Sequence, residues 1–498
     1  RNVIGFIENV TVVNMHIFTR RFLRLYQKKA FLSMFCAGLY INFCVGMNYN
    51  YGMGKTIKEN KMEKIAFIGA GSLQFTTSCV RDLLCFPAFD ECEFALMDVN
   101  AENLKKIETV VKKITYNMKR PGCKVTATTD RAGALKGADG VLCTVFNGDV
   151  DVWQYDILIP EKYGVDINVG DTRSVSGIFR ALRNIPLMLD ICRDIEKYCP
   201  KAVFLNYTNP MSMLCGAMQK YSGVEVTGLC HSVQGTVKML SEWLDVPCDE
   251  ITYRCAGVNH QAFYTVLEHN GSDLYPRLRK LLENPDYYNR EQVRNEMFLK
   301  LGYYPTESSG HNSEYNPWFR KRPDLIEKYC TNGTNWNPGR HAFSLELRKK
   351  RKADGLKQYD DWLEKRFDPE KSNEYAADIF NARIGDGKPF VFNGNVLNRG
   401  SIPNLPADAC VEVPVVADRM GFKTTIAGPL PEHIAILINT TARIESMVVD
   451  AAMQKSRESV YRAVCMDPLC SAVCSLDEIQ HMCDELFDAN SAFLGDYK

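Results

Sequence analysis

The sequence predicts an α/β fold, in which a doubly wound parallel sheet is followed by a mixed α/β (α+β) domain. From Lys64 to about residue 230, short β-branched or apolar segments alternate with amphipathic helical segments. That order is typical of parallel strands joined by crossover helices. A glycine turn, "IGAGS", follows the first strand-like segment, and beyond Ile251 strands and helices come in mixed order. Together these observations favour a Rossmann-like, lactate/malate dehydrogenase-like architecture.

Each element follows from its residue pattern. In the first part we expect strands in 64–72, 92–100, 124–130, 140–146, 202–210 and 224–230. Amphipathic spacing predicts helices over 76–86, 101–118 and 176–199, the last interrupted near Pro186. In the second part we expect strands over 251–258, 263–269, 389–396 and 409–418, and helices over 344–366 and 431–454. The last helix has apolar residues at helical spacing, which predicts packing on the core or on a second subunit.

The chain divides into three predicted parts. Residues 1–61 form an upstream extension, 62–230 a nucleotide-binding domain, and 231–498 a mixed α/β catalytic and oligomerisation domain. The extension contains a charge-free run, Ala30–Gly54, long enough to resemble a signal anchor or membrane span. Asparagines and glycines dilute that run, and Met62 opens "MEKIAFIGAGS" as a natural start would. We therefore expect an extension that is not part of the fold, rather than a targeting segment.

Composition narrows the class of partner. Sixty basic residues balance sixty acidic ones, so the charge indicates neither nucleic acid nor an anionic membrane as partner. A small neutral or weakly charged ligand is expected. The nineteen cysteines are scattered singly without a CxxC pair, which is typical of a reducing, cytoplasmic compartment.

The segment "IGAGS" is a candidate dinucleotide site. Gly69 and Gly71 permit a tight turn and the approach of a pyrophosphate to the helix start at Ser72. The third position of the fingerprint is Gln74, so the motif is weak by itself. Asp98, at the end of the next strand, would accept hydrogen bonds from a ribose diol and would repel a 2′-phosphate. The pattern favours NAD over NADP; the alternative is a turn that only lets the helix pack.

Cys230 and His260 each follow a strand-like segment, near the carboxyl edge where such sheets bind ligands. Together they offer a thiolate and an imidazole to a divalent ion, which would keep open positions for substrate oxygens. Two alternatives stay open. Cys230 could be a nucleophile with a histidine base, or both residues could be ordinary core and turn residues.

Polar residues gather in four segments that we expect to be loops. These are 168–174, 179–183, 206–210 and 306–315. In the first of them, Asp171, Thr172 and Ser174 could simply cap a helix. The last, "TESSGHNSEY", has little apolar content and looks like a sugar-binding or acid/base loop.

With these residues in place, the sequence resembles glycoside hydrolase family 4, the NAD- and Mn-dependent glycosidases, from Met62 to the C-terminal helices. The motifs that carry the resemblance are "IGAGS", "GDTRSVSGIFRALRNIP", "LNYTNPM", "GLCHSVQG", "GVNHQAF" and "TESSGHNSEY". In that family the tetrapeptide at the metal cysteine follows the substrate class, and "CHSV" (230–233) looks like the α-galactosidase form. An α-galacturonidase or α-glucosidase of the same family is the nearest alternative.

The resemblance implies an unusual route of hydrolysis. NAD⁺ would oxidise the sugar at C3, and a base would then remove the acidified C2 proton so that the aglycone leaves by elimination. Water would add to the product, and NADH would return the hydride. This route differs from that of most glycosidases, which use a pair of carboxylates. Mn²⁺ would bind Cys230, His260 and the sugar's 2- and 3-oxygens. A homo-oligomer, a dimer or tetramer, is also implied.

The resemblance also implies roles for further residues. His231 would either protonate the leaving oxygen or only bind the sugar, and Tyr315 is the first choice for the C2 base, ahead of Glu307 and His311. Asn209 would touch the sugar hydroxyls, Asp171 and Arg180 would bind substrate, and Asn147 would lie beside the nicotinamide.

Two other classes of protein remain as rivals. A hydroxy-acid dehydrogenase with the same nucleotide domain predicts net NADH formation without a need for Mn²⁺. A catalytically silent nucleotide-binding regulator would have no use for Cys230, His260 and the polar segments.

Overall fold

The computed structural model describes residues 62–334 and 337–498. Residues 62–498 form one compact unit. The predicted extension, residues 1–61, and its charge-free run lie outside the described residues.

The first half of this unit is a parallel sheet. Its strands are β1 (Glu63–Ile68), β2 (Cys92–Met97), β3 (Lys124–Thr128), β4 (Gly140–Cys143), β5 (Val203–Asn206) and β6 (Val226–Leu229). They lie in the order β3-β2-β1-β4-β5-β6, and every neighbouring pair is parallel. This is the strand order of a doubly wound dinucleotide-binding sheet, so the predicted fold class is confirmed.

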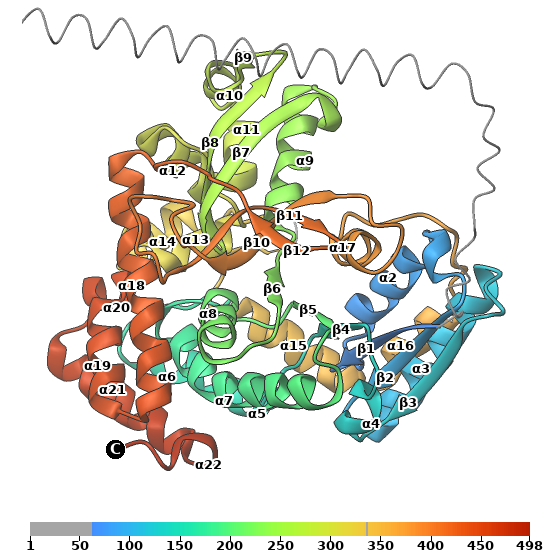
Figure 1. Ribbon diagram of the computed structural model, residues 1–498. Helices are drawn as coiled ribbons and strands as arrows, with labels where there is room; N and C mark the ends of the chain where they lie inside the picture. The colour runs from blue at the N-terminus through green and yellow to red at the C-terminus, as the bar shows by residue number, and fades with distance from the viewer. Residues whose placement is uncertain (1–61, 335–336) are drawn as a thin grey trace, which may run out of the picture. The chain divides into compact units, whose positions relative to one another are not determined.

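The second half continues the same sheet with antiparallel strands (Figure 1). They are β7 (Ile251–Val258), β8 (Gln261–His269), β9 (Ser272–Asp273), β10 (Phe390–Leu397), β11 (Cys410–Asp418) and β12 (Gly421–Thr424). The order beyond β6 is β10-β11-β7-β8-β9, with β12 paired to β11. The junction is antiparallel, with Gly394 opposite Leu229 and Asn395 opposite Gly228. One sheet of twelve strands therefore joins the two predicted domains, whose exact boundary stays a prediction.

Helices cover both faces of the parallel strands. On β1, Ile65 and Phe67 face one core cluster, and Ala66 and Ile68 face the other, as the two-residue period of a strand requires. The first cluster packs against α2 (Leu73–Leu83), α3 (Ala101–Asn117), α16 (Lys357–Glu364) and α17 (Ala376–Arg383). The second packs against α4 (Arg131–Leu135), α7 (Ser174–Tyr198), α8 (Met211–Tyr221) and α18 (Glu432–Gln454).

Helix α7 corrects two expectations. It runs unbroken through Pro186, and it contains 179–183, which we expected to be a loop. Proline removes one backbone hydrogen bond, but most residues of this helix are buried, so its packing offsets that loss. The capping role left open for Asp171, Thr172 and Ser174 is also wrong, because Arg173 occupies the N-cap position and no side chain caps the helix.

Helix α18 packs on α7 and α8, so the predicted C-terminal helix lies against the protein's own core (Figure 1). The other helices that contribute to the same core cluster are α5 (Asp149–Trp153), α6 (Tyr155–Lys162), α15 (Phe343–Asp354), α19 (Arg457–Met466), α20 (Pro468–Val473), α21 (Leu476–Ala489) and α22 (Ser491–Leu494). The helices around the β7–β8 hairpin are α9 (Ser232–Leu244), α10 (Tyr275–Leu281), α11 (Pro285–Tyr288), α12 (Gln292–Leu301), α13 (Ser309–Tyr315) and α14 (Pro323–Tyr329). Single 3₁₀ turns span Pro87–Phe89, Cys248–Glu250 and Asn289–Glu291.

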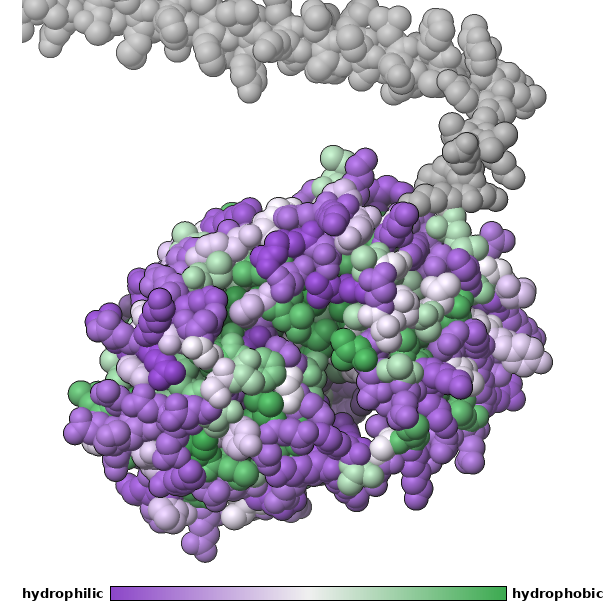
Figure 2. Space-filling model, turned by 90° about the horizontal axis from the view of Figure 1, so that it is seen from below, coloured by the Kyte–Doolittle hydropathy of each residue, from purple (hydrophilic) through white to green (hydrophobic). Residues whose placement is uncertain are grey.

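The face seen from below is mainly hydrophilic, with apolar residues gathered around a hollow (Figure 2). Among the described residues, no helix combines the length and hydropathy that crossing a bilayer requires. The cysteines of this part of the chain are free thiols, and most are buried.

Candidate active site

The glycine turn after β1 has the close packing that a dinucleotide cradle needs. Gly69 has φ +84°, and a Cβ added there would lie 2.8 Å from the carbonyl oxygen of Thr144. The N–H of Gly71 donates to Asp98 Oδ2 at 2.8 Å, so the acid at the end of β2 is fixed against the turn. Ser72 is the N-cap residue of α2, and its side chain makes no capping bond. A Cβ at Gly69 or Gly71 would clash with its neighbours, so both positions need glycine, as the predicted nucleotide turn does.

We expect Gly71→Ala to weaken NAD binding by about tenfold or more, since a steric clash of this kind costs about 1–3 kcal/mol. The added Cβ would lie 2.7 Å from Asp98 Oδ2 and would displace that carboxylate. The measurement is NAD affinity by calorimetry. Gly235→Ala in α9 is the matched control, because a Cβ there meets nothing within 4 Å. Equal NAD affinity in both variants would contradict the cradle.

A cysteine, a histidine and a glutamate converge beyond the ends of β6 and β7. One ligand atom each from Cys230, His260 and Glu307 lies within 4.8 Å of the other two. Cys230 follows β6, His260 lies in the turn between β7 and β8, and Glu307 precedes α13. The predicted pair Cys230 and His260 is therefore brought together, and Glu307 joins it.

His260 is oriented by its other ring nitrogen. Its Nδ1 lies 3.2 Å from Thr172 Oγ1, which donates its own proton to Asp171 Oδ1 at 2.7 Å. The hydroxyl oxygen can therefore accept a bond from Nδ1–H, which leaves the Nε2 lone pair free. Nε2 lies 3.4 Å from Glu307 Oε2. Metal-binding histidines characteristically have such a second hydrogen bond, so the arrangement fits a divalent ion at Nε2.

The protonation states of this group also suit a metal. Burial lowers the pKa of His260 to about 4, so its imidazole is neutral at pH 7. Burial alone would raise the pKa of Glu307, but the nearby His311 and His260 lower it to about 2, so the carboxylate is ionised. Burial raises the pKa of Cys230 well above its ordinary value. A bound divalent cation would reverse that, because a coordinating thiol loses its proton.

Tyr315, the predicted base, lies beside this group. Its hydroxyl is 3.4 Å from His260 Nδ1, and its ring lies under the guanidinium of Arg173, with Cζ 5.0 Å from the ring centroid. Arg173 Nη2 donates to Glu445 Oε1 at 3.0 Å and to the carbonyl oxygen of Asn259. A buried ion pair between the N-cap residue of α7 and a glutamate of α18 therefore holds a positive charge over the tyrosine.

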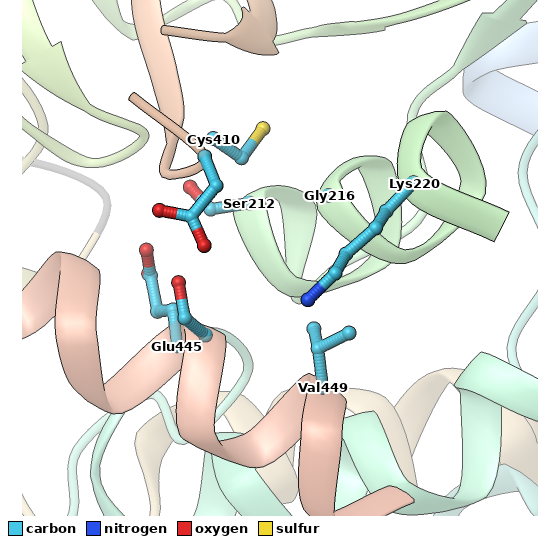
Figure 3. Close-up of a pocket in the computed structure, with 8 residues that line it drawn as sticks. Ser212, Gly216, Lys220, Cys410, Glu445 and Val449 are labelled. Atoms are coloured by element: carbon cyan, nitrogen blue, oxygen red, sulfur yellow. The ribbon is translucent and has the colours of Figure 1, made fainter. Parts of the chain in front are cut away.

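Glu445 also lines a pocket between α8, α18 and the start of β11 (Figure 3). The pocket is lined by Ser212, Gly216, Lys220, Asp408, Cys410, Glu445, Ser446 and Val449. None of the residues predicted for the site lines it. Its relation to the site is through Glu445, which binds Arg173.

The predicted substrate residues form a second connected group. Asn209 Nδ2 donates to Asp171 Oδ2 at 3.2 Å, and Arg180 Nε donates to the carbonyl oxygen of Asn209 at 3.2 Å. Asn209 Oδ1 and Arg180 Nη1 are buried and make no hydrogen bond within the described part of the chain. Buried polar atoms are normally paired, so a donor and an acceptor without partners fit a polyhydroxylated ligand.

The segment 306–315 corrects another expectation, because most of it is helix α13 and not a loop. The seven residues of this helix are buried although most are polar. Ser308 Oγ accepts a bond from the N–H of His311, and Glu291 Oε2 accepts one from that of Ser309. Glu314 Oε2 and Oε1 accept bonds from the backbone N–H groups of 168–170 at 2.8–2.9 Å. The polar residues form a helix because these hydrogen bonds offset the burial.

The other predicted residues lie around this centre. His311 Nδ1 is 3.2 Å from Glu307 Oε1, and its Nε2 is 3.5 Å from Asp171 Oδ1. These carboxylates outweigh the effect of burial and raise the pKa of His311 to about 9, so the ring is a cation at pH 7. The side chain of His231 is 63 % exposed, with Nδ1 3.7 Å from Glu374 Oε1. Asn147, beyond β4, donates through Nδ2 to the carbonyl oxygen of Arg183 at 3.0 Å.

Comparison with known proteins gives this geometry a context. The model described as "Family 4 glycosyl hydrolase" matches residues 64–246, and "Family 4 glycosyl hydrolase C-terminal domain" matches 255–470. The chain belongs to family 4 of the glycosyl hydrolases. An α-galactosidase of Bacillus subtilis is 39% identical over 88% of this chain and 100% of its own length. An α-galactosidase of Rhizobium meliloti is 37% identical over 87% of this chain and 89% of its own length.

The fold of this family 4 glycosyl hydrolase is shared by solved structures. A 6-phospho-α-glucosidase from gut microorganisms, solved in complex with NAD and Mn²⁺, superposes with a TM-score of 0.72 at 20% identity. The similarity covers 88% of this chain and 100% of the solved one.

Several residues of this glycosyl hydrolase site were not predicted from sequence. Glu445 is one acid on the buried face of α18, among Ile438, Thr441 and Val448, and that spacing was a usable signal. Glu314 gave no such signal, because its carboxylate is directed by the fold toward 168–170.

Proposed function

We propose that this glycosyl hydrolase is an α-galactosidase that hydrolyses terminal α-galactosides of small, unphosphorylated sugars with NAD and Mn²⁺ as cofactors. The main support is the convergence of Cys230, His260 and Glu307 in a chain that also has a glycine turn with the packing of a dinucleotide cradle. The similarity to α-galactosidases along nearly the whole chain supports the choice of sugar.

In this proposal, the cofactors supply a hydride acceptor for the sugar's C3 and a Lewis acid that acidifies the neighbouring C2–H. Cys230 and His260 hold the metal, and the turn at Gly69 and Gly71 holds the dinucleotide with Asp98. A C2–H beside an ether is far too weak an acid for a side chain, so a protein base is sufficient only once C3 has been oxidised. Oxidation is transient, so the overall reaction is hydrolysis.

The protein's own groups then divide the proton transfers and the binding. Tyr315 removes the C2 proton, because its hydroxyl lies next to the metal-binding histidine. Asn209 and Arg180 bind sugar hydroxyls through their free acceptor and donor atoms, and Asp171, which accepts a bond from Asn209, completes this substrate-binding group. His231 is exposed, as a group that gives a proton to a departing aglycone needs to be. We assign it that role.

The deciding assay follows nitrophenol release from 4-nitrophenyl α-galactoside under reducing conditions. We expect release to need both NAD⁺ and Mn²⁺ and to leave no net NADH. Release without either cofactor, or stoichiometric NADH, would refute the proposal in favour of an ordinary glycosidase or a dehydrogenase. Parallel arms with the α-galacturonide and the α-glucoside distinguish the two alternatives within the family.

We further infer that the enzyme acts in a reducing, cytoplasmic compartment as a homo-oligomer. The free cysteines support the first inference, since Cys230 must be a thiol to bind metal. Light scattering of the purified protein tests the second; a monomer at assay concentration would refute it.

A further inference from the structure

We propose that Glu307 is a third protein ligand of the metal, through Oε2, and is therefore not the base that removes the C2 proton. The proposal rests on the proposed function, which supplies the metal and its pair of ligands. Its basis is geometric: the ligand atoms of Cys230, His260 and Glu307 form one group within 4.8 Å.

The two oxygens of Glu307 have different surroundings. Oε1 accepts a hydrogen bond from the N–H of Ser308 at 3.1 Å and lies 3.2 Å from His311 Nδ1. Oε2 faces His260 Nε2 at 3.4 Å. One oxygen is therefore held by the start of α13 and by a cationic histidine, and the other is directed at the ring nitrogen that is free to bind metal. This is the arrangement of a monodentate carboxylate ligand with a supporting second shell.

The backbone also holds this group in place. Glu307 has φ 65° and His260 has φ 61°, in a left-handed region that residues other than glycine seldom adopt. Such conformations cost about 1–3 kcal/mol each and persist where the surrounding structure imposes them, characteristically at functional sites. Glu307 and His260 both adopt this left-handed conformation, and their side chains meet at the proposed metal position.

A rival group of three, Asp171, His260 and His311, has ligand atoms equally close together. This group is the poorer metal site, because the ring nitrogens of His311 and the oxygens of Asp171 already have partners. His311 Nδ1 lies 2.6 Å from Ser308 Oγ, and its Nε2 faces Asp171. Asp171 accepts bonds from Thr172 and Asn209. In the Cys230 group, Oε2 and Nε2 face each other without another hydrogen bond among the described residues. Cys230 Sγ bonds only to Ser232, whose N–H can still donate to a metal-bound thiolate.

The third ligand changes what the site can do. A thiolate and a carboxylate neutralise the charge of a divalent ion, so the ion is bound more tightly than by a thiolate and an imidazole alone. A six-coordinate ion such as Mn²⁺ still keeps positions for two sugar oxygens. A carboxylate bound to metal is a weak base, so removal of the C2 proton is left to Tyr315.

The test compares Glu307→Gln with Asp171→Asn, which make the same chemical change in the two rival groups. Mn²⁺ affinity is measured by electron paramagnetic resonance of the free ion, without substrate or NAD. Asp171→Asn disturbs the bond from Thr172 that orients His260, an outer change that costs about 10–100-fold in affinity. We expect Glu307→Gln, which removes a ligand charge, to raise the Kd further than Asp171→Asn does. Glu307→Asp, which keeps a carboxylate on a shorter side chain, recovers part of the affinity. Thermal unfolding without metal shows that each variant is folded.

The outcomes separate this proposal from the function it rests on. An unchanged Kd in Glu307→Gln, or a larger loss in Asp171→Asn, overturns the role of Glu307 while leaving Cys230 and His260 as ligands. If wild-type protein binds no Mn²⁺, or if Cys230→Ala binds it as well as wild type, the proposed function fails at the metal itself.

Discussion

Tyr315→Phe will lower kcat for α-galactosides by about 10²–10⁴-fold, the usual contribution of a positioned base. The substitution removes only the hydroxyl that lies 3.4 Å from His260 Nδ1 and leaves the ring under Arg173. The measurement is steady-state kinetics with 4-nitrophenyl α-galactoside, with and without deuterium at C2. We expect the isotope effect to rise in the variant, because proton removal becomes the slow step.

The control for this variant is Tyr304→Phe, which also removes a buried hydroxyl, one that donates to Asn295 Oδ1 at 2.9 Å. It should keep kcat within a few-fold of wild type. A Tyr315→Phe enzyme with more than about a tenth of the wild-type kcat would assign the C2 base to another residue.

The base must lose its proton in a buried place. Burial raises the pKa of Tyr315 well above its ordinary value, and the charges of Asp171 and Glu314 raise it further, whereas Arg173 lowers it. The ion pair of Arg173 with Glu445 therefore keeps in position the protein cation that favours the phenolate. A metal at His260 Nε2 would add to the same effect.

Cys230→Ala will abolish the response to Mn²⁺ and lower kcat/KM by about 10³-fold or more, since a Lewis acid supplies several kcal/mol of transition-state stabilisation. Wild-type enzyme treated with a chelator should show the same loss and recover when Mn²⁺ returns, whereas the variant should not recover. Both are measured in the nitrophenol assay with NAD⁺ present.

Cys483→Ala is the matched control, because this thiol is fully buried in the C-terminal helical layer. It should stay dependent on Mn²⁺. Full recovery of activity by Cys230→Ala at moderate Mn²⁺ would show that the thiolate is not a ligand.

Much of the fold is predictable because it is local. The parallel strands β1 to β6 and the helices between them follow from alternating patterns, and their order is the common one for such folds. The pairing of β6 with β10 was not predictable, because a strand pattern does not name a partner so far along the chain. The unbroken α7 shows the same limit, since burial along its length outweighs the tendency of Pro186 to break it.

The site divides in the same way. Cys230 was predictable because it follows a strand of the parallel half, at the edge where such sheets bind ligands. His260 was predicted by the same rule, but three antiparallel pairings separate β6 from β7, so the two strands run in opposite directions and the tertiary fold brings His260 to Cys230. The rest depends on the direction of side chains. The ion pair of Arg173 with Glu445 joins two helices whose packing the sequence does not reveal. Tyr359 of α16, which donates to the carbonyl oxygen of Gly71 at 3.0 Å, gave no signal either.

The antiparallel junction between β6 and β10 also governs how the chain folds during its synthesis. β6 leaves the ribosome long before β10, and the whole β7–β8 hairpin and the helices from α9 to α17 are made in between. Until β10 arrives, the nascent nucleotide-binding half ends in an open strand edge, which is a template for pairing with other chains. Cys230 directly follows that edge strand, so the metal thiol lies beside an unpaired edge until β10 has been made.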